Sequence, residues 1–410
     1  MKINSSTGAA PTTSSFLPLF WLALGTFAVG TESFMIAGLL PEMAADLQVS
    51  VVAAGQLVTV FALAYALSSP VLTALTGAID RRRLMIAAMV MFTLANLMAG
   101  TATNYWWLMA ARILLAASAG IFVPGANALA GATVTPERRG TALAIVNGGI
   151  SIAVAFGVPL GALIGAHLGW RMTFFGVAML SALATAGLIF GLPRGIGANL
   201  PVATLRERLA TARRPVILMS LLVTTLWAMG AYTVYTYLAL LVSHATMLRG
   251  AEIGYVLFMW GAAAAIGVAI GGKAVDRLGP RPVILPSLAV MTLAFALLSA
   301  SAYWLSPVHA LLPLLVGVVA WGLAHWSFFP AQQANLIGIA GLKGTPIVLS
   351  LNASFMYLGF SLGAALGALT LSVFSVSDLG WVGAACEVGA LALTLAVNGV
   401  FARCVKPSVA

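Results

Sequence analysis

The chain carries very little charge for its size. Of its 410 residues, 7% are charged and only ten are Asp or Glu, whereas 61% are hydrophobic. Ordinary soluble domains are about 25% charged and about half apolar. A water-soluble fold with this composition would expose a very large apolar surface, but a bilayer solvates such a surface. The composition excludes an ordinary soluble protein and predicts an all-α integral membrane protein.

Metal-binding and redox residues are equally scarce. Four histidines and two cysteines are present, with no CxxC pair and no Cys/His cluster. Cys386 and Cys404 lie on one predicted helix, roughly 27 Å apart along its axis, whereas a disulfide requires about 7 Å or less. We predict no structural metal, no disulfide and no bound cofactor.

The sequence shows no nucleophile–base pair within its apolar segments. The stretch GFSLG at 359–363 fits the G-x-S-x-G pattern of hydrolases. That pattern requires a strand–turn–helix corner with a histidine and an acid nearby, but here it lies inside an apolar helix. We interpret Gly359 and Gly363 as a helix-packing face and predict that the chain is not an enzyme.

Long apolar runs dominate the sequence. A membrane span needs about 20 mostly apolar residues. The first run is too long for a signal peptide and is interpreted as a retained span. Twelve predicted spans result, at 17–40, 51–76, 84–102, 105–133, 141–166, 172–192, 216–242, 251–272, 283–304, 309–336, 345–374 and 379–402.

The basic residues follow the predicted topology. The net charge is +10, and 17 of the 20 Lys and Arg fall on one side of the twelve-span map. Only Arg171 and Arg249 fall on the other side, and Arg112 lies inside a span. By the positive-inside rule both termini are cytoplasmic in a multi-pass plasma (inner) membrane protein. The basic residues therefore indicate contact with lipid and not with nucleic acid.

A polar segment divides the spans six and six. The predicted parts are a tail (1–16), a six-helix half (17–192), a linker (193–215), a second six-helix half (216–402) and a tail (403–410). Within the linker, TLRERLATARR is either a short interfacial helix or a solvated loop. The two halves carry similar loops, and duplicated six-helix halves are typical of transporters with a site at the interface. Such a fold works as a monomer.

The loop GKAVDRLGPR at 272–281 resembles the loop motif of the major facilitator superfamily. The first-half copy, GAIDRRR at 77–83, is degenerate. The resemblance implies the twelve-helix fold of that family and gating loops in which Asp–Arg pairing holds helices together in one state. The alternative is plain topology-setting charge. The predicted gating residues are Asp80, Arg81, Gly272, Asp276, Arg277, Gly279 and Arg281.

Three segments resemble the arabinose-efflux and drug:proton antiporter branch of the family. They are GTESFMIAGLLPEMAADLQVS at 30–50, Arg112 in AARILLAASAG, and VAFGVPLGALIG at 154–165. The last is similar to the antiporter motif through Gly157, Pro159 and Gly161, with Val158 in place of a usual glycine. The resemblance implies export of small molecules by proton antiport, with alternating access.

Glu32 and Arg112 are the predicted proton-coupling residues. Glu32 stands within roughly 6 Å of the centre of its span at 1.5 Å per residue, where burying a carboxylate costs at least a few kcal/mol. An arginine as deep as Arg112 must pair, line water or reach back to the interface. The alternatives are a structural carboxyl bonded between helices and a structural arginine.

Other polar residues in the spans are weaker candidates. Glu387 and His325 are each a candidate for a second proton site. For both, the competing interpretation is a structural role. Predicted cavity residues are Asn147, Trp227, Tyr232, Tyr235, Asn352 and Phe355. One acid and one base leave a central cavity near neutrality, so we expect a neutral or zwitterionic substrate, such as a drug, sugar or nucleoside.

The alternative to export is another mode of transport, and a channel is disfavoured. Proton-coupled uptake or facilitated movement of a metabolite uses the same architecture. A channel would more naturally show a filter loop or rings of like charge than two related halves.

Overall fold

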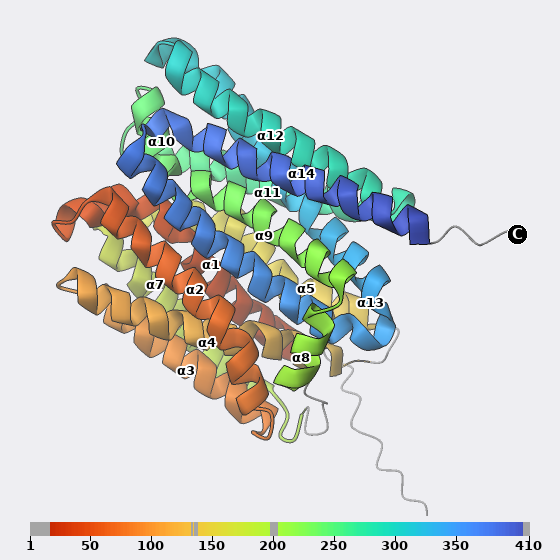
Figure 1. Cartoon of the computed structure of the whole chain (residues 1–410). Coiled ribbons are helices and arrows are strands. Elements are labelled where there is room, and N and C mark those ends of the chain that lie inside the picture. Colours follow the sequence, from red (N-terminus) through yellow and green to blue (C-terminus); the bar gives the residue numbers. More distant parts are fainter. Residues whose placement is uncertain (1–16, 133, 135–137, 197–203, 405–410) are drawn as a thin grey trace, which may run out of the picture.

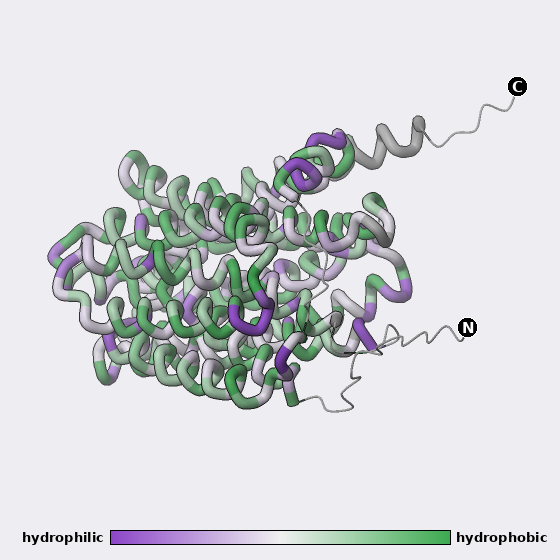
Figure 2. The backbone as a smooth tube through the Cα atoms, turned by 90° about the horizontal axis from the view of Figure 1, so that it is seen from below, coloured by the Kyte–Doolittle hydropathy of each residue, from purple (hydrophilic) through white to green (hydrophobic). Residues whose placement is uncertain are grey.

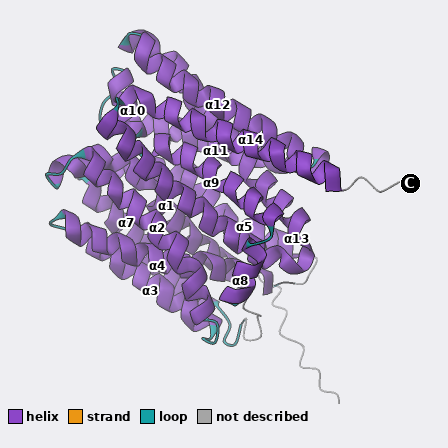
Figure 3. Cartoon of the chain, viewed as in Figure 1, coloured by secondary structure: helices purple, strands orange, loops and turns teal. Residues whose placement is uncertain are grey.

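The computed structural model describes residues 17–132, 134, 138–196 and 204–404, and within them the regular structure is entirely helical (Figures 1 and 3). The predicted tails at 1–16 and 405–410 lie outside the described residues. The first half, as we call the first six spans, contains α1 (Leu17–Asp46), α2 (Val51–Leu75), α3 (Arg81–Gly100), α4 (Tyr105–Ala132), α5 (Arg139–Ile152), the π-helical turn η2 (Ala153–Gly157), α6 (Val158–Leu168) and α7 (Trp170–Gly191).

The second half follows a short linker helix, α8 (Leu205–Ala212). It contains α9 (Pro215–Tyr235), α10 (Leu238–Ala245), α11 (Ala251–Leu278), α12 (Arg281–Trp304), α13 (Pro307–Val373), the 3₁₀ turn η3 (Val376–Asp378) and α14 (Leu379–Cys404). Within the described residues, twelve helical stretches are long and apolar enough to cross a membrane. The twelve predicted spans are therefore confirmed.

Four spans differ in detail from the prediction. The seventh, predicted at 216–242, ends at Tyr235, and a turn at 236–237 separates it from α10. The fifth is interrupted by η2, because Pro159 cannot donate a hydrogen bond to Ala155 and a wider turn relieves the clash. The tenth and eleventh spans are continuous in α13 except at Gly341, whose φ of 72° is accessible to glycine and marks a kink.

The two halves lie side by side, with α1–α7 in red to yellow and α9–α14 in green to blue (Figure 1). Within each half the helices pack on one another, and α1 is buried on nearly every side. The halves meet where α2 packs on α13 and where α11 packs on η2 and α6. These contacts place α1, which carries Glu32, next to the interface between the halves.

We call the end of the bundle that carries α8 the linker end and the opposite end the far end. All described basic residues of the turns fall at the linker end except Arg171 and Arg249. Figure 2 shows hydrophobic residues along most helix lengths and hydrophilic residues mainly at turns and ends. This distribution is the one expected of a protein whose helices cross a bilayer. Cys386 is a free thiol.

Candidate functional site

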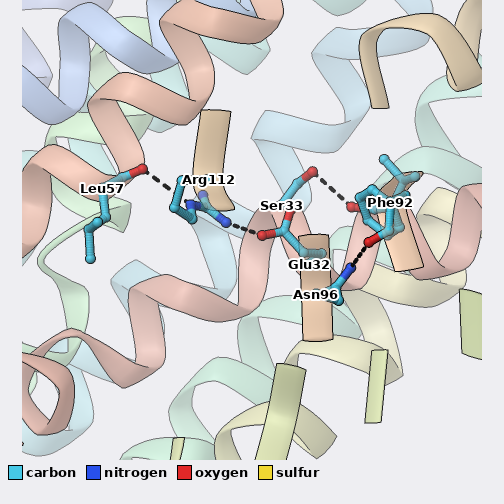
Figure 4. A network of polar contacts seen from close by, with 7 residues as sticks. Glu32, Ser33, Leu57, Phe92, Asn96 and Arg112 are labelled. Atoms are coloured by element: carbon cyan, nitrogen blue, oxygen red, sulfur yellow. Dashed lines mark hydrogen bonds and ion pairs between the residues drawn. The ribbon is translucent and has the colours of Figure 1, made fainter. Parts of the chain in front are cut away.

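A buried ion pair joins α1 to α4 near the middle of the first half (Figure 4). Glu32 stands halfway along α1, and its Oε1 accepts a hydrogen bond from Nη1 of Arg112. Both side chains have 0% exposure. A buried carboxylate and a buried guanidinium compensate each other's charge, which resolves the prediction for Arg112 in favour of pairing.

Arg112 also holds α2. Its Nε donates to the carbonyl oxygen of Leu57 at 3.3 Å, and its guanidinium carbon lies 4.0 Å from the ring centroid of Phe61. The guanidinium therefore links three helices through a carboxylate, a carbonyl and an aromatic face (Figure 4).

Two nearby polar side chains form hydrogen bonds with backbone carbonyls and not with Glu32 or Arg112. Ser33 Oγ donates to the carbonyl of Val29, and Asn96 Nδ2 donates to that of Phe92 (Figure 4). The second oxygen of Glu32 and Nη2 of Arg112 are buried and have no hydrogen-bond partner among the described residues. Oε2 of Glu32 and Nη2 of Arg112 can therefore each bind a further group.

The predicted antiporter-motif residues pack directly against this part of α1. Gly157 lies so close to Thr31 that a Cβ there would collide with the Thr31 hydroxyl, and Gly161 faces Met35. Pro159 lies at the start of α6, just past the π-helical turn. On the other side of η2, Gly261 of α11 approaches the carbonyl of Val154. The motif helix is therefore held between α1 and the second half.

Aromatic side chains connect the ion-pair region to the second half. Phe34, two residues after Glu32, contacts Tyr232 and Tyr235, and the Tyr235 hydroxyl donates to the carbonyl of Phe34 at 3.0 Å. Tyr232 stacks on Phe360 with ring centroids 3.7 Å apart. Two of the predicted cavity residues thus lie at the interface between the halves.

The other predicted cavity residues lie elsewhere. Asn147 is exposed in the first half and accepts a hydrogen bond from Asn127 at 3.3 Å. Asn352 is buried and accepts one from Thr224 at 2.8 Å. The carbonyl of Phe355 accepts a hydrogen bond from the hydroxyl of Thr225, and the Trp227 ring stacks on His325. The structure does not bring these four together with Glu32.

Glu387 and His325 are buried inside the second half. His325 is 2% exposed and stacks on Trp227, with ring centroids 4.2 Å apart. Glu387 is 0% exposed and faces α9 at Gly230, and neither of its carboxyl oxygens has a hydrogen-bond partner among the described residues. Unlike Glu32, Glu387 has no basic partner within ion-pair distance there.

The gating-loop residues lie at the linker end. Asp80 caps α3 by accepting from the backbone N–H of Arg83 at 2.9 Å, and Arg81 Nη2 donates to the carbonyl of Gly77. Gly279 has a φ of 81° and ends α11. Asp276 forms no ion pair with any described residue. The predicted Asp–Arg pairing is absent from this conformation in the described chain.

The remaining second-half loop residues frame the same turn. Gly272 and Arg277 lie in the last two turns of α11, and Arg281 begins α12. The glycine at 279 is required because a side chain at that φ is strained, which explains one position of the motif in physical terms.

Sequence reasoning missed a group of residues on α2 and α13. Tyr65 stacks on Tyr357 with ring centroids 3.6 Å apart and an angle of 17°, and Ser361 Oγ donates to the carbonyl of Thr59 at 2.9 Å. Phe61 lies between Arg112 and Tyr357. The available signal was a tyrosine near the middle of each of two predicted spans, Tyr65 and Tyr357.

Comparison with known proteins agrees with this geometry. The sequence profile of the Major Facilitator Superfamily matches residues 22–247. Among solved structures, a mutant form of the nucleoside transporter NupG superposes with a TM-score of 0.71 at 12% sequence identity, over 93% of this chain and 99% of that one. At that identity the likeness shows the fold alone.

Sequence relatives extend over most of the chain. An uncharacterized MFS-type transporter, YbcL, from Bacillus subtilis (strain 168) is 34% identical over 89% of this chain and 92% of that protein. The inner membrane transport protein YdhP from Escherichia coli (strain K12) is 31% identical over 87% of this chain and 89% of that protein. A chloramphenicol resistance protein from Streptomyces lividans is 34% identical over 64% of this chain and 67% of that protein.

These likenesses agree with the twelve spans and the two packed halves. The chain belongs to the Major Facilitator Superfamily of membrane transporters.

Proposed function

We propose that this transporter exports neutral small molecules in exchange for protons. The observation that carries the proposal is the Glu32–Arg112 pair, fully buried at mid-helix and linked to the interface between the halves. A carboxyl in this setting has two stable states: it is ionised and paired with Arg112, or it is protonated and neutral. That property is what proton coupling requires.

The coupling step follows from the contacts of Arg112. Protonation of Glu32 removes the Coulomb attraction that holds Arg112 toward α1. The guanidinium keeps its contacts with Leu57 and Phe61 on α2, so the balance of forces between α1, α4 and α2 changes. Since α2 packs on α13, the change reaches the interface between the halves.

The contacts between the halves suit a conformation of the carrier that is open to substrate at the linker end. Among the described residues, their hydrogen bonds and ring contacts lie between the middle of the bundle and the far end, as for Tyr235 with Phe34 and Ser361 with Thr59. The excess of basic residues argues that the linker end is cytoplasmic in the inner membrane. A substrate taken up there and released at the far end is exported.

The charge of the central region argues for a neutral substrate. Glu32 and Arg112 compensate each other, and a substrate carrying an unpaired charge would bear its own desolvation cost. Tyr232, Phe360 and Phe34 offer aromatic surface nearby. The relative named for chloramphenicol resistance makes amphenicols the first compounds to test.

The test uses the purified chain in proteoliposomes with an imposed pH gradient. Transport of a labelled amphenicol, a nucleoside, a sugar and a lipophilic cation is measured. We expect gradient-driven, saturable transport of a neutral compound, and Glu32→Gln is expected to lower it at least tenfold because Gln cannot bind and release a proton. In Glu32→Gln the buried Arg112 charge loses its partner, so the free energy of unfolding of this variant should fall by up to about 3–5 kcal/mol.

Glu387→Gln is the matched control, because it changes a second fully buried carboxyl that has no basic partner among the described residues. It should retain gradient-driven transport. Folding of both variants is checked by monodisperse size-exclusion profiles and circular dichroism. Wild-type pH dependence in Glu32→Gln vesicles, or transport of cations alone, contradicts the proposal.

A further inference from the structure

The seventh span breaks at the turn 236–237, between α9 and α10. The backbone leaves the helical region at Tyr237, where φ is −113° and ψ is 19°, and α10 begins at the next residue. The turn contains neither proline nor glycine, so no local backbone preference dictates the break. α10 lies at the far end, opposite α8 (Figure 1), and packs on α1 of the first half as well as on α12 and α13.

The ring of Tyr237 lies between a helix of the first half and a helix of the second half. Its side chain is buried, with 1% exposure. At its tip lies Gly55 of α2, where a Cβ would collide with the Tyr237 hydroxyl. At the opposite edge lies Gly367 of α13, where a Cβ would stand 2.7 Å from Cε2 of the ring. We call this space the Tyr237 slot; its two walls are glycine backbone, and an alanine at either position would not fit beside the ring.

Packing holds the ring in the slot more than hydrogen bonding does. The Tyr237 hydroxyl donates to the carbonyl of Ala364 on α13 at 3.3 Å, which is long for a bond between two oxygens. The wall on α2 is fixed separately, because the Tyr105 hydroxyl of α4 donates to the carbonyl of Ala53 at 2.9 Å. The fit of the ring, and not its hydroxyl, is therefore the main contact across the slot.

The Tyr237 slot is a different layer of the interface from the Tyr65–Tyr357 stack. Gly55 precedes Tyr65 by ten residues on α2, and Gly367 follows Tyr357 by ten residues on α13. The slot therefore lies about 15 Å nearer the far end. Separation of α2 from α13 at that end must draw one wall away from the ring.

We propose that Tyr237 is the gating residue of the far end. Its ring, inserted between Gly55 and Gly367, keeps α2 and α13 together there, and the far end opens when the ring leaves the Gly55 wall. The inference rests on the proposed function only for the direction of transport, because a carrier that took substrate up at the far end would open in the same way.

Two substitutions disturb the slot from opposite sides. In Tyr237→Ala the closed state loses the contacts of a buried ring, so it becomes less favourable relative to the open state. In Gly55→Ala the added methyl group fits only if the ring moves, which also disfavours closure. Gly176→Ala is the matched control, because Gly176 is a helical glycine of α7 with open space at its Cβ. Tyr237→Phe keeps the ring and loses only the long hydrogen bond.

Pulsed electron resonance between labels at Val51 and Ser372 measures the separation of α2 and α13 at the far end. The labels are placed in a full-length chain in which Cys386 and Cys404 are replaced. We expect the fraction of molecules with separated far ends to rise at least about threefold in Tyr237→Ala and in Gly55→Ala. It should stay at the wild-type value in Tyr237→Phe and in Gly176→Ala.

The double variant Gly55→Ala/Tyr237→Ala separates a specific contact from a general loss of structure. Its distances should equal those of Tyr237→Ala alone, because the added methyl group then meets no ring. A single size-exclusion peak is required of every variant, and Tyr237→Leu replaces Tyr237→Ala if the latter does not fold.

Several outcomes overturn the proposal. They are unchanged distances in Tyr237→Ala or in Gly55→Ala, an equal shift in Gly176→Ala or in Tyr237→Phe, and additive shifts in the double variant. The measurement uses neither substrate nor a pH gradient, so it decides the gate even if no neutral compound is exported.

Discussion

At the scale of single residues, Arg112 is where three helices of the first half meet. It bonds to Glu32 of α1, to the Leu57 carbonyl of α2, and lies over the Phe61 ring, also of α2. These contacts use different atoms of one planar group. A lysine offers a single compact charge in place of that planar fork and cannot reproduce the arrangement.

We therefore expect Arg112→Lys to keep the charge but to impair coupling. The ammonium group can still compensate Glu32, so the protein should fold, but it cannot also hold Leu57 and Phe61. Gradient-driven transport should fall about tenfold or more, while substrate binding changes little. Parallel measurement of binding affinity and transport in proteoliposomes checks this. Wild-type transport in the lysine variant would show that charge alone suffices.

At the scale of elements, the linker helix α8 has its own N-terminal capping box. The Thr204 hydroxyl accepts from the Glu207 backbone N–H, and a Glu207 carboxylate oxygen accepts from the Thr204 backbone N–H at 2.7 Å. These bonds hold the pKa of the Glu207 carboxyl below its usual value. Of the two interpretations of TLRERLATARR, a short helix or a solvated loop, the structure shows the helix, at Leu205–Ala212.

The sign of the pH dependence follows from that lowered pKa. The carboxylate stabilises α8 above the ordinary Glu pKa of about 4.3, and the contribution is lost as the pH falls through the lowered folded-state value. A spin label at the exposed Leu209 should become more mobile below about pH 4. In Glu207→Gln, which keeps an acceptor but no charge, that pH-dependent change should disappear. The same transition in both proteins would exclude Glu207 as its cause.

Asp276 lies near the end of α11, just before the turn to α12. It lies at the linker end, away from the Glu32–Arg112 pair, and forms no ion pair with described residues in this conformation. If it pairs in another state of the transport cycle, Asp276→Asn should slow turnover several-fold and leave affinity within about twofold. A large loss of affinity with normal turnover would place Asp276 in substrate binding instead.

At the scale of the whole molecule, the contact between α2 and the eleventh span holds the halves together near mid-bundle. The Tyr65–Tyr357 stack and the Ser361–Thr59 hydrogen bond both cross from one half to the other. Since Phe61 of α2 touches both Arg112 and Tyr357, this contact is one route from the ion pair to the second half.

Tyr357→Ala should favour separation of the halves at the far end. An aromatic pair contributes about 0.5–1.5 kcal/mol beyond its buried area, which shifts a two-state population about 2- to 12-fold at about 1.4 kcal/mol per factor of ten. Pulsed electron resonance between labels at Val51 and Ser372 measures the distance distribution. Tyr357→Phe keeps the ring and should behave as the wild type; an unchanged distribution in Tyr357→Ala would argue against the contact as a closure.

The sequence by itself determined the twelve spans, and it predicted the division into halves and singled out Glu32 and Arg112 as charged residues inside spans. Apolar length and rare charge are local properties, and in a bilayer they are decisive because an uncompensated charge or an unbonded backbone is costly there. Only the tertiary structure decided that these two residues, 80 positions apart, form a pair. It also decided that Tyr65 meets Tyr357, that Asn147 and Asn352 lie apart, and that Tyr237 reaches α2. Those outcomes depend on which helix faces approach one another, and helices that are apolar all round give no such signal.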